Sequence, residues 1–335
     1  MSVIVLNWNG EKWIRKLFES IFRSSYSNIE VILADNNSSD SSLEICGEFP
    51  HVRQVRFEKN HGYARANNLA AHLAKGEFLF FLNNDTWIEI DTIKRLVATL
   101  IGNHELLAAA PDVREYWSDA RVNNGVSIDI FGYPVLPEPA ISGRGTFLYA
   151  DGCGLFCRAS HFNCIGGFDP SYFMYGEDLE LGWKGMLLGH FTVPSPNAIV
   201  HHLGGGSSDQ WGKSHTEKAK DRYKLNLQKR RLAERNTLLN ILKFYSAHWL
   251  ALILPIYFLL NVCEAILLSI RNKRFTPLRI YAGAWHEALK MLSDELPLRK
   301  AIQTKRVIGE VQVLRSLVWK YSKFSTAMRR GVPIV

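Results

Sequence analysis

The chain has 335 residues, of which 47% are hydrophobic and 21% are charged, a balance that can support a large buried core. This composition excludes an intrinsically disordered protein, and the length suits one large domain with an appendage, or two domains. The net charge of +8 is unevenly distributed: residues 1–212 carry −8 and residues 213–335 carry +16. The basic excess is therefore C-terminal, where it suits either nucleic acid or an anionic membrane surface.

The five cysteines are odd in number and widely spaced, which favours a reducing compartment over a disulfide framework. Cys153, Cys157 and Cys164 lack the paired close spacing of a zinc site, so we expect them to be core thiols. Met1 and Ser2 lead directly into an apolar strand without a signal peptide, which predicts that the catalytic part stays in the cytoplasm.

The first hundred residues alternate between strands and helices. Short apolar runs predict strands at residues 3–6, 31–34, 52–57 and 78–82, and a helix follows each of the first three. This alternation is typical of right-handed crossovers and of a mostly parallel sheet whose polar strand ends gather along one edge. We therefore expect Asp35, the turn at residues 60–68 and Asp85 to meet in space.

The fourth of these strands has the strongest signal. Phe78–Leu82 is a run of five apolar residues, as in a strand buried on both faces, and Asn83, Asn84 and Asp85 follow it directly. Ligands of open α/β sheets bind outside the carboxyl ends of the strands, and one carboxylate there commonly holds Mg²⁺ against phosphate oxygens. Taken alone, the three residues would more simply be a turn that caps the next helix.

Four motifs in this order resemble glycosyltransferase family 2: Val5–Gly10, Asp35–Asp40, Asn60–Asn68 and Phe81–Asp85. The resemblance implies the α/β fold called GT-A, which is a Rossmann-like mixed, mostly parallel sheet flanked by helices. It also implies that residues 1–100 bind a nucleotide sugar and that residues 101–212 bind the acceptor. A variable stretch from Glu105 to Thr146 follows, in which Pro134, Pro137 and Pro139 mark loop.

In that family the first strand end and the acid after the second strand hold the base and ribose of a nucleotide-diphosphate sugar. The donor-binding residues that the resemblance implies are Asn7, Asn9, Asp35, Asn60, Gly62, Ala64, Asn67, Asn84 and Asp85. Asp85 would also bind Mg²⁺ or Mn²⁺ on the diphosphate. The usual metal motif is Asp-x-Asp, and here Asn83 replaces its first acid, as in many members of the rhamnosyltransferase-like branch.

A second group of motifs, from Ala150 to Lys184, resembles the acceptor half of the same family. Glu177 and Asp178 stand at the start of a predicted helix, where the positive end of the helix dipole should keep carboxylates ionised. An ionised carboxylate can act as a base, so Asp178 is our choice for the catalytic base and Glu177 is its rival. Ordinary capping of the helix by these acids is the alternative.

A strand that ends in His201 and His202 is followed by a glycine-rich turn. Family members complete their metal site with a histidine, so the resemblance implies that one of these imidazoles joins Asp85 at the metal. Side chains alternate across a strand, so we expect only one of the two to face the site.

Residues 244–270 are almost wholly apolar and lie between basic segments, of which the first covers residues 213–243. The length suits a membrane-spanning helix, but Pro255, Asn261 and Glu264 argue against a simple one. We therefore expect a helix or a bent hairpin that lies in the cytoplasmic leaflet of an anionic membrane.

Trp249 and Tyr257 would sit at the membrane interface in that arrangement. Residues 213–335 would then form a basic, helical, membrane-associating region that holds the enzyme, as a peripheral or monotopic protein, on the cytoplasmic face of a bacterial inner membrane. A buried helical subdomain or a homodimer interface is the alternative.

The sequence thus predicts an inverting, metal-dependent glycosyltransferase that transfers a sugar to a lipid-linked glycan acceptor in the synthesis of bacterial cell-surface polysaccharide. The rhamnosyltransferase-like resemblance implies dTDP-L-rhamnose as the donor, with UDP-hexose or UDP-galactofuranose as alternatives. A nucleic-acid-binding protein is disfavoured, because the basic residues bracket an apolar segment rather than form a solvated face with stacking aromatic residues. A non-catalytic carbohydrate- or membrane-binding relative is the third alternative.

Overall fold

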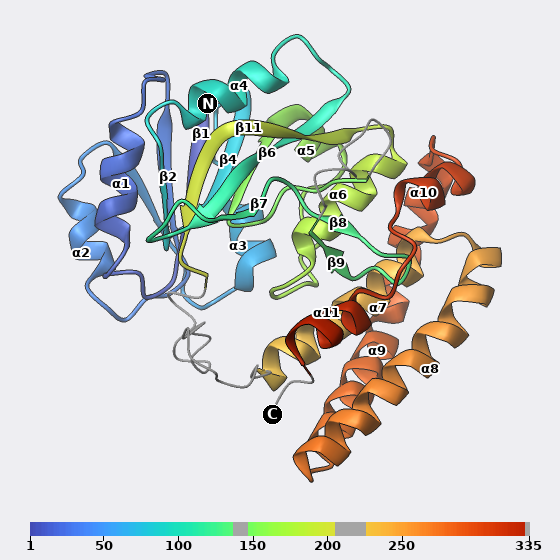
Figure 1. The fold of residues 1–335 in the computed structure, drawn as a ribbon. Helices are drawn as coiled ribbons and strands as arrows, with labels where there is room; N and C mark the ends of the chain where they lie inside the picture. The colour runs from blue at the N-terminus through green and yellow to red at the C-terminus, as the bar shows by residue number, and fades with distance from the viewer. Residues whose placement is uncertain (137–146, 205–225, 332–335) are drawn as a thin grey trace.

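The computed structural model describes residues 1–136, 147–204 and 226–331 (Figure 1). The strands are β1 (Ser2–Asn7), β2 (Glu30–Asp35), β3 (Val52–Arg56), β4 (Phe78–Asn83), β5 (Thr86–Ile88), β6 (Leu106–Glu115), β7 (Arg121–Asn123), β8 (Ser127–Ile128), β9 (Pro134–Val135), β10 (Gly154–Arg158) and β11 (Phe191–His202). The helices are α1 (Ile14–Phe22), α2 (Ser42–Gly47), α3 (Gly62–Ala71), α4 (Thr92–Leu100), α5 (Ala159–Cys164), α6 (Glu177–Leu187), α7 (Leu227–Phe244), α8 (Ala247–Asn272), α9 (Thr276–Lys305), α10 (Glu310–Ser316) and α11 (Ser322–Arg330).

One mixed sheet forms the centre of the N-terminal part. Its strand order is β3-β2-β1-β4-β10-β6-β11-β5, with β7 added beside β6. Strands β3, β2, β1 and β4 are parallel, as the alternation of strands and helices predicts, whereas β10 runs antiparallel between β4 and β6. The register pairs Asn7 with Asp35 and Leu6 with Asn83, so the polar ends of three strands meet at one edge.

The two faces of the sheet bury separate apolar layers, because alternate side chains of each strand point to opposite sides. On one face Val3, Val5 and Phe80 pack with helices α1 and α4. On the other face Ile4 and Phe81 pack with α3 and α6 and with the C-terminal helices. Helices therefore cover both faces, which is why β4 is apolar at every position from Phe78 to Leu82.

The variable stretch between Glu105 and Thr146 contains a long strand that was not predicted. Leu106–Glu115 forms β6, which pairs with β10 and with β11 inside the sheet. Its run of leucine and small alanine side chains is buried from Leu106 to Ala110, which fits a strand covered on both faces. Residues 137–146 lie outside the described residues.

The cysteine prediction is correct in part. Cys153 and Cys157 are buried, as expected for core thiols, but Cys164 is exposed at the C-terminal end of α5. The described cysteines are free thiols.

The C-terminal helices pack against the acceptor half of the sheet domain and against one another. Helix α7 lies between α6 and α9, and α8 and α9 form a long hairpin whose turn is at Lys273, a residue with a φ of 52° (Figure 1). Of the helix and the bent hairpin that were expected within residues 244–270, the structure has the helix, α8, which is paired with the next helix. The expected boundary at residue 212 and the basic residues up to Lys224 lie outside the described residues.

A buried ion cluster fixes α7 to the rest of the molecule. Lys243 is 1% exposed, and its Nζ lies 2.6 Å from Asp169, 3.2 Å from Glu295 of α9 and 3.6 Å from Glu180 of α6. The ring of Tyr172 lies 4.4 Å from the same nitrogen. Since a buried ammonium group needs such partners, the cluster ties three helices together.

Candidate active site

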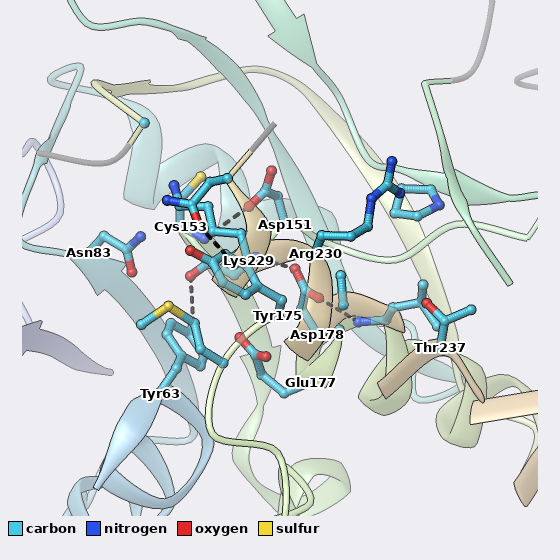
Figure 2. Close-up of a pocket in the computed structure, with 18 of the residues that line it drawn as sticks. Tyr63, Asn83, Asp151, Cys153, Tyr175, Glu177, Asp178, Lys229, Arg230 and Thr237 are labelled. Carbon is cyan, nitrogen blue, oxygen red and sulfur yellow. Dashed lines mark hydrogen bonds between the residues drawn. The ribbon is translucent and has the colours of Figure 1, made fainter. Parts of the chain in front are cut away.

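A cavity of about 830 Å³ opens where the ends of β1 and β4 face α6 and α7 (Figure 2). Asn83, Asn84 and Asp85 line it from the sheet, and Glu177 and Asp178 line it from α6. The sequence-predicted metal and base residues are therefore brought to one cavity, whose volume is in the range of small-molecule sites.

A chain of buried amides holds the strand ends in place. The Asn7 side chain accepts a 2.8 Å hydrogen bond from Asn84 and donates one of 2.8 Å to Asp35. Asp35 also accepts hydrogen bonds from the backbone N–H and the hydroxyl of Ser38. Asn7 and Asp35 are 0% and 2% exposed, so the network shapes the floor of the site, while only Asn84 of these three residues lines the cavity.

The turn after β3 closes the same side. Asn60 accepts hydrogen bonds from the Asn36 side chain and from the backbone N–H of Gly62, each of 2.9 Å. Gly62 has a φ of 75°, and a Cβ atom there would lie 2.2 Å from the carbonyl oxygen of Phe173. Only glycine allows this approach, and all three of Asn36, Asn60 and Gly62 line the cavity.

Three other predicted donor contacts lie behind the site rather than in it. Ala64 is part of the apolar core, and Asn67 is 1% exposed on α3 with no hydrogen-bond partner for its amide among the described residues. Asn9 supports the Ser38–Ser39 turn by accepting a hydrogen bond from the Ser39 N–H and donating its own N–H to Ser38. None of these three residues is among those that line the cavity.

The two histidines have different surroundings, as strand alternation predicts. Nε2 of His202 lies 3.3 Å from Oδ1 of Asp85, and outside this contact it has no partner among the described residues. His201 instead stacks on Trp87 at 3.7 Å between ring centres and contacts Glu89 and the carbonyl of Glu115. The assignment of His201 as a metal ligand is therefore wrong, and His202 is the residue beside Asp85.

Asp85 and His202 could hold a divalent cation. Asp85 is 3% exposed, and its carboxylate and the His202 imidazole supply one oxygen and one nitrogen that converge on the cavity. Burial lowers the pKa of His202, but the negative charges of Asp85 and Asp151 outweigh it, so that the pKa is raised. Within the described parts of the chain, no cluster of three or more acidic, histidine or cysteine side chains could complete a metal cage. Such a partial set fits a cation that also binds substrate phosphates.

Two backbone N–H groups fix the orientation of the Asp178 carboxylate. Its Oδ2 accepts a 2.9 Å hydrogen bond from the Gly152 N–H, and its Oδ1 accepts one of 2.7 Å from the Leu179 N–H. Burial and then the nearby charge of Asp151 raise the pKa of Asp178 to about 7, although the two backbone N–H groups act in the opposite direction. A carboxyl group with this pKa can accept a proton near neutral pH.

The carboxyl group of Glu177 differs from that of Asp178 in its hydrogen bonding and its pKa. It is 5% exposed, and its Oε2 has no hydrogen-bond partner among the described residues. Burial, with the charge of Asp178 added, raises the pKa of Glu177 well above its ordinary value. The expectation that the start of α6 keeps both acids ionised was therefore wrong, because burial of the side chains outweighs the helix dipole.

Asp151 is a site residue that the sequence reasoning missed. It lines the cavity, accepts hydrogen bonds from Asn123 and from the Cys153 N–H, and contributes to the raised pKa values of both Asp178 and His202. It precedes Gly152 in a motif that resembles the family pattern. An acid directly before the turn at Gly152 and Cys153 was the available signal.

Helix α7 forms a whole wall of the cavity, which was also missed. Its lining residues, with the capping residue before it, are Asn226, Lys229, Arg230, Ala233, Glu234, Thr237 and Asn240. Their spacing of three or four residues marks one helical face, and this was the signal in the sequence. The region expected to serve only membrane association therefore also builds the site.

The same helix positions the start of α6. The side chain of Asn236 donates hydrogen bonds to the carbonyl groups of Met174 and Tyr175, at 3.1 and 2.6 Å. Tyr175 has a φ of 70°, which is uncommon for a residue with a Cβ atom, and it directly precedes the Gly176 cap of α6. Asn236 thus holds the strained turn that presents Glu177 and Asp178.

The N-terminal part of the chain is similar in sequence to known glycosyltransferases. Residues 2–155 match the model of glycosyl transferase family 2. Glycosyltransferase GlyA of Streptococcus pneumoniae is 30% identical over 132 residues, which cover 38% of this chain and 17% of GlyA. TarS of Staphylococcus aureus, a poly(ribitol-phosphate) beta-N-acetylglucosaminyltransferase, is 30% identical over 109 residues, which cover 31% of this chain and 19% of TarS.

Solved structures establish the GT-A fold over nearly the whole chain. The crystal structure of S. aureus TarS superposes with a TM-score of 0.54 at 16% identity and covers 94% of this chain and 54% of TarS. The mannosyltransferase PcManGT of Pyrobaculum calidifontis, in complex with GDP-Man and Mn²⁺, gives a TM-score of 0.55 at 15% identity and covers 98% of this chain and 86% of that one. At these identities the likeness concerns the fold alone.

Proposed function

We propose that this protein is an inverting glycosyltransferase that transfers a sugar from a nucleotide-diphosphate donor to a hydroxyl group of a cell-surface glycan. The observation that carries the proposal is the placement of Asp178, with a pKa of about 7, in the same cavity as the Asp85–His202 pair. The match to family 2 supports the reaction class, and the name of the relative TarS supports a cell-surface acceptor.

In this proposal Asp178 serves the acceptor hydroxyl, and the Asp85–His202 pair serves the diphosphate of the donor. Asp178 accepts the proton of the acceptor hydroxyl as that oxygen attacks the anomeric carbon, and the bond from this carbon to the diphosphate breaks with its electron pair left on the phosphate oxygen. Gly152 N–H keeps the carboxylate aimed into the cavity. A divalent cation held by Asp85 and His202 would neutralise charge on the diphosphate. One displacement inverts the anomeric centre.

The donor sugar is open to a direct test. The motifs resemble the rhamnosyltransferase-like branch and suggest dTDP-L-rhamnose, whereas TarS and WfaP of Escherichia coli are named as N-acetylglucosaminyl and UDP-Glc-dependent glucosyl transferases. The full-length protein should release nucleoside diphosphate from one member of a panel of UDP-, dTDP- and GDP-sugars in the presence of Mg²⁺ or Mn²⁺. Release from none of them, while the same nucleotides bind, would indicate a non-catalytic relative.

We also propose that the protein lies on the cytoplasmic surface of an anionic membrane and receives a lipid-linked acceptor there. Among the described residues, one helix, α8, is long and apolar enough to cross a bilayer. Its inner face is buried against the protein at Ile253, Tyr257 and Ala265, whereas Leu259, at 63% exposed, stands on its outer face. Burial of one face favours a helix that lies along the surface over one that spans. The expected interface role of Tyr257 was wrong, since its ring is 0% exposed.

The distribution of basic residues also supports membrane binding through α8. The exposed basic residues Arg271, Lys273 and Arg274 follow the apolar face directly, and residues 213–335 carry a net charge of +16. Cations beside an apolar face are the combination that anionic lipid headgroups attract.

A further inference from the structure

The cavity contains more acidic than basic side chains, and most of the basic ones already have partners. Arg230 pairs with Glu234 at 3.1 Å and with Glu264 at 3.0 Å. Lys323 of α11 pairs with the same two carboxylates at 2.6 and 2.8 Å. These four groups balance one another, so they add no net charge to the cavity.

Lys229 is the exception. Among the described residues, no carboxylate lies within ion-pair distance of its ammonium group. It lines the same cavity as Asp85 and Asp178, and its Nζ lies 5.8 Å from the centre of the Tyr175 ring (Figure 2). Burial lowers the pKa of Lys229, and the negative charge of Asp85 opposes this effect.

The backbone holds this side chain in place. The Asn226 side chain caps α7 by accepting a 3.1 Å hydrogen bond from the Lys229 N–H, so Lys229 stands in the first turn of the helix. The positive end of an eighteen-residue helix dipole therefore adds to its charge. Asn236, two turns further along, fixes the helix to the loop that carries Tyr175.

We propose that the ammonium group of Lys229 binds phosphate oxygens of the nucleotide-diphosphate donor, so that the C-terminal helical region supplies a donor-binding residue to the sheet domain. The inference rests on the proposed function and names a further residue of the same site. A partly desolvated ammonium group without a carboxylate at ion-pair distance among the described residues can take an anion of the substrate as its partner, and lysine binds phosphate as a point charge. When the bond from the anomeric carbon to the diphosphate breaks, Lys229 stabilises the negative charge left on the phosphate oxygen.

The test measures binding without turnover. The full-length protein and its Lys229→Met variant are titrated with UDP, dTDP and GDP, and with the corresponding nucleosides, by calorimetry at a fixed Mg²⁺ concentration. We expect Lys229→Met to weaken the binding of the preferred diphosphate roughly 10- to 100-fold and to leave the nucleoside unaffected. Lys229→Arg should recover part of the loss. Lys290→Met, which removes an exposed lysine of α9, is the matched control and should bind as the wild type does.

The proposal is overturned if Lys229→Met is folded, as judged by its thermal unfolding, and binds the diphosphate with unchanged affinity. If that variant also shows a raised KM for a phosphate-bearing acceptor, Lys229 binds the acceptor instead. Failure of the wild type to release diphosphate from any donor sugar would count against the proposed function but not against this binding result, so the two failures are distinguishable.

Discussion

Oδ2 of Asp178 accepts a 2.9 Å hydrogen bond from the backbone N–H of Gly152, which joins the start of α6 to the turn before β10. The contact places the carboxylate near Asp151, whose negative charge adds to burial in raising the pKa of Asp178 to about 7. The pKa of Asp178 therefore depends on a residue outside α6.

Activity should depend on the ionisation of Asp178. Because the proton acceptor must be the carboxylate, the reaction rate should reach a plateau above pH 7 and fall about tenfold for each pH unit below it. The measurement is kcat/KM for sugar transfer between pH 5 and 9 at saturating metal. Asp151→Asn removes one negative charge, so it should shift the midpoint of the profile to lower pH. A midpoint near pH 4 in the wild type would contradict the assignment of Asp178.

Asp178 and Glu177 should respond differently to amide substitution. Asp178→Asn removes the proton acceptor and should lower kcat by roughly 10²–10⁴-fold while donor affinity is retained. Burial and the charge of Asp178 raise the pKa of Glu177 well above its ordinary value, which favours its neutral form, and Glu177→Gln resembles that form. That variant should keep most of the activity. If Glu177→Gln proves more damaging than Asp178→Asn, the roles of the two acids are reversed.

Metal dependence should separate the two histidines. Chelation should abolish transfer, and Mg²⁺ or Mn²⁺ should restore it, because we propose that Asp85 and His202, which lie 3.3 Å apart, hold the cation. His202→Gln should raise the metal concentration needed for half activity by at least about tenfold. His201→Gln is the matched control, since His201 stacks on Trp87, and it should behave like the wild type. Full activity in excess chelator would remove Asp85 from this role.

The buried ion cluster should dominate the attachment of the C-terminal helices. Lys243→Met leaves the carboxylates of Asp169, Glu180 and Glu295 without their shared cation, so the free energy of unfolding should fall by about 3–5 kcal/mol. Chemical denaturation with and without the substitution measures the change. Lys300→Met, at an exposed position of α9, should change stability little. An unchanged midpoint in Lys243→Met would mean that the helices are held by apolar packing alone.

The sheet and the position of Asn83, Asn84 and Asp85 at its edge could be predicted because they depend on local signals. Phe78–Leu82 is apolar at each position, as a doubly covered strand requires, and the polar residues follow it directly. The alternation rule also predicted that one of His201 and His202 faces the site. By contrast, β6 was missed because its alanine-rich run has low β-propensity and pairs with strands far away in the sequence.

The ionisation of the acids and the α7 wall required the folded structure. A helix N-terminus favours charged carboxylates, but the burial that reverses this effect for Glu177 and Asp178 depends on the packing of α7 and the β10 turn. Lys229 looked like one of many basic residues in the C-terminal region. Its place near the Tyr175 ring, in the cavity that Asp85 also lines, distinguishes it from a lysine that meets the solvent or a lipid surface.

The outer face of α8 should determine membrane binding. Its exposed apolar residues follow a helical spacing and include Leu252, Ile256, Leu259, Ile266 and Ile270. Salt screens the attraction between basic residues and lipid headgroups but does not weaken the burial of apolar side chains. The full-length protein should therefore stay bound to vesicles of anionic lipid at high salt and be released by detergent.

A charge on that face should weaken this binding. The double substitution Leu259→Glu and Ile266→Glu should shift the protein to the soluble fraction at high salt, while thermal unfolding and diphosphate binding stay unchanged, because both side chains point away from the core. Ile90→Glu and Ile101→Glu, at exposed apolar positions of the sheet domain, are the matched control. Vesicle sedimentation and analytical ultracentrifugation measure the two outcomes. If the wild type is soluble without detergent and the double variant converts a dimer into a monomer, the α8 face is a subunit interface, and the lipid-linked acceptor loses its main support.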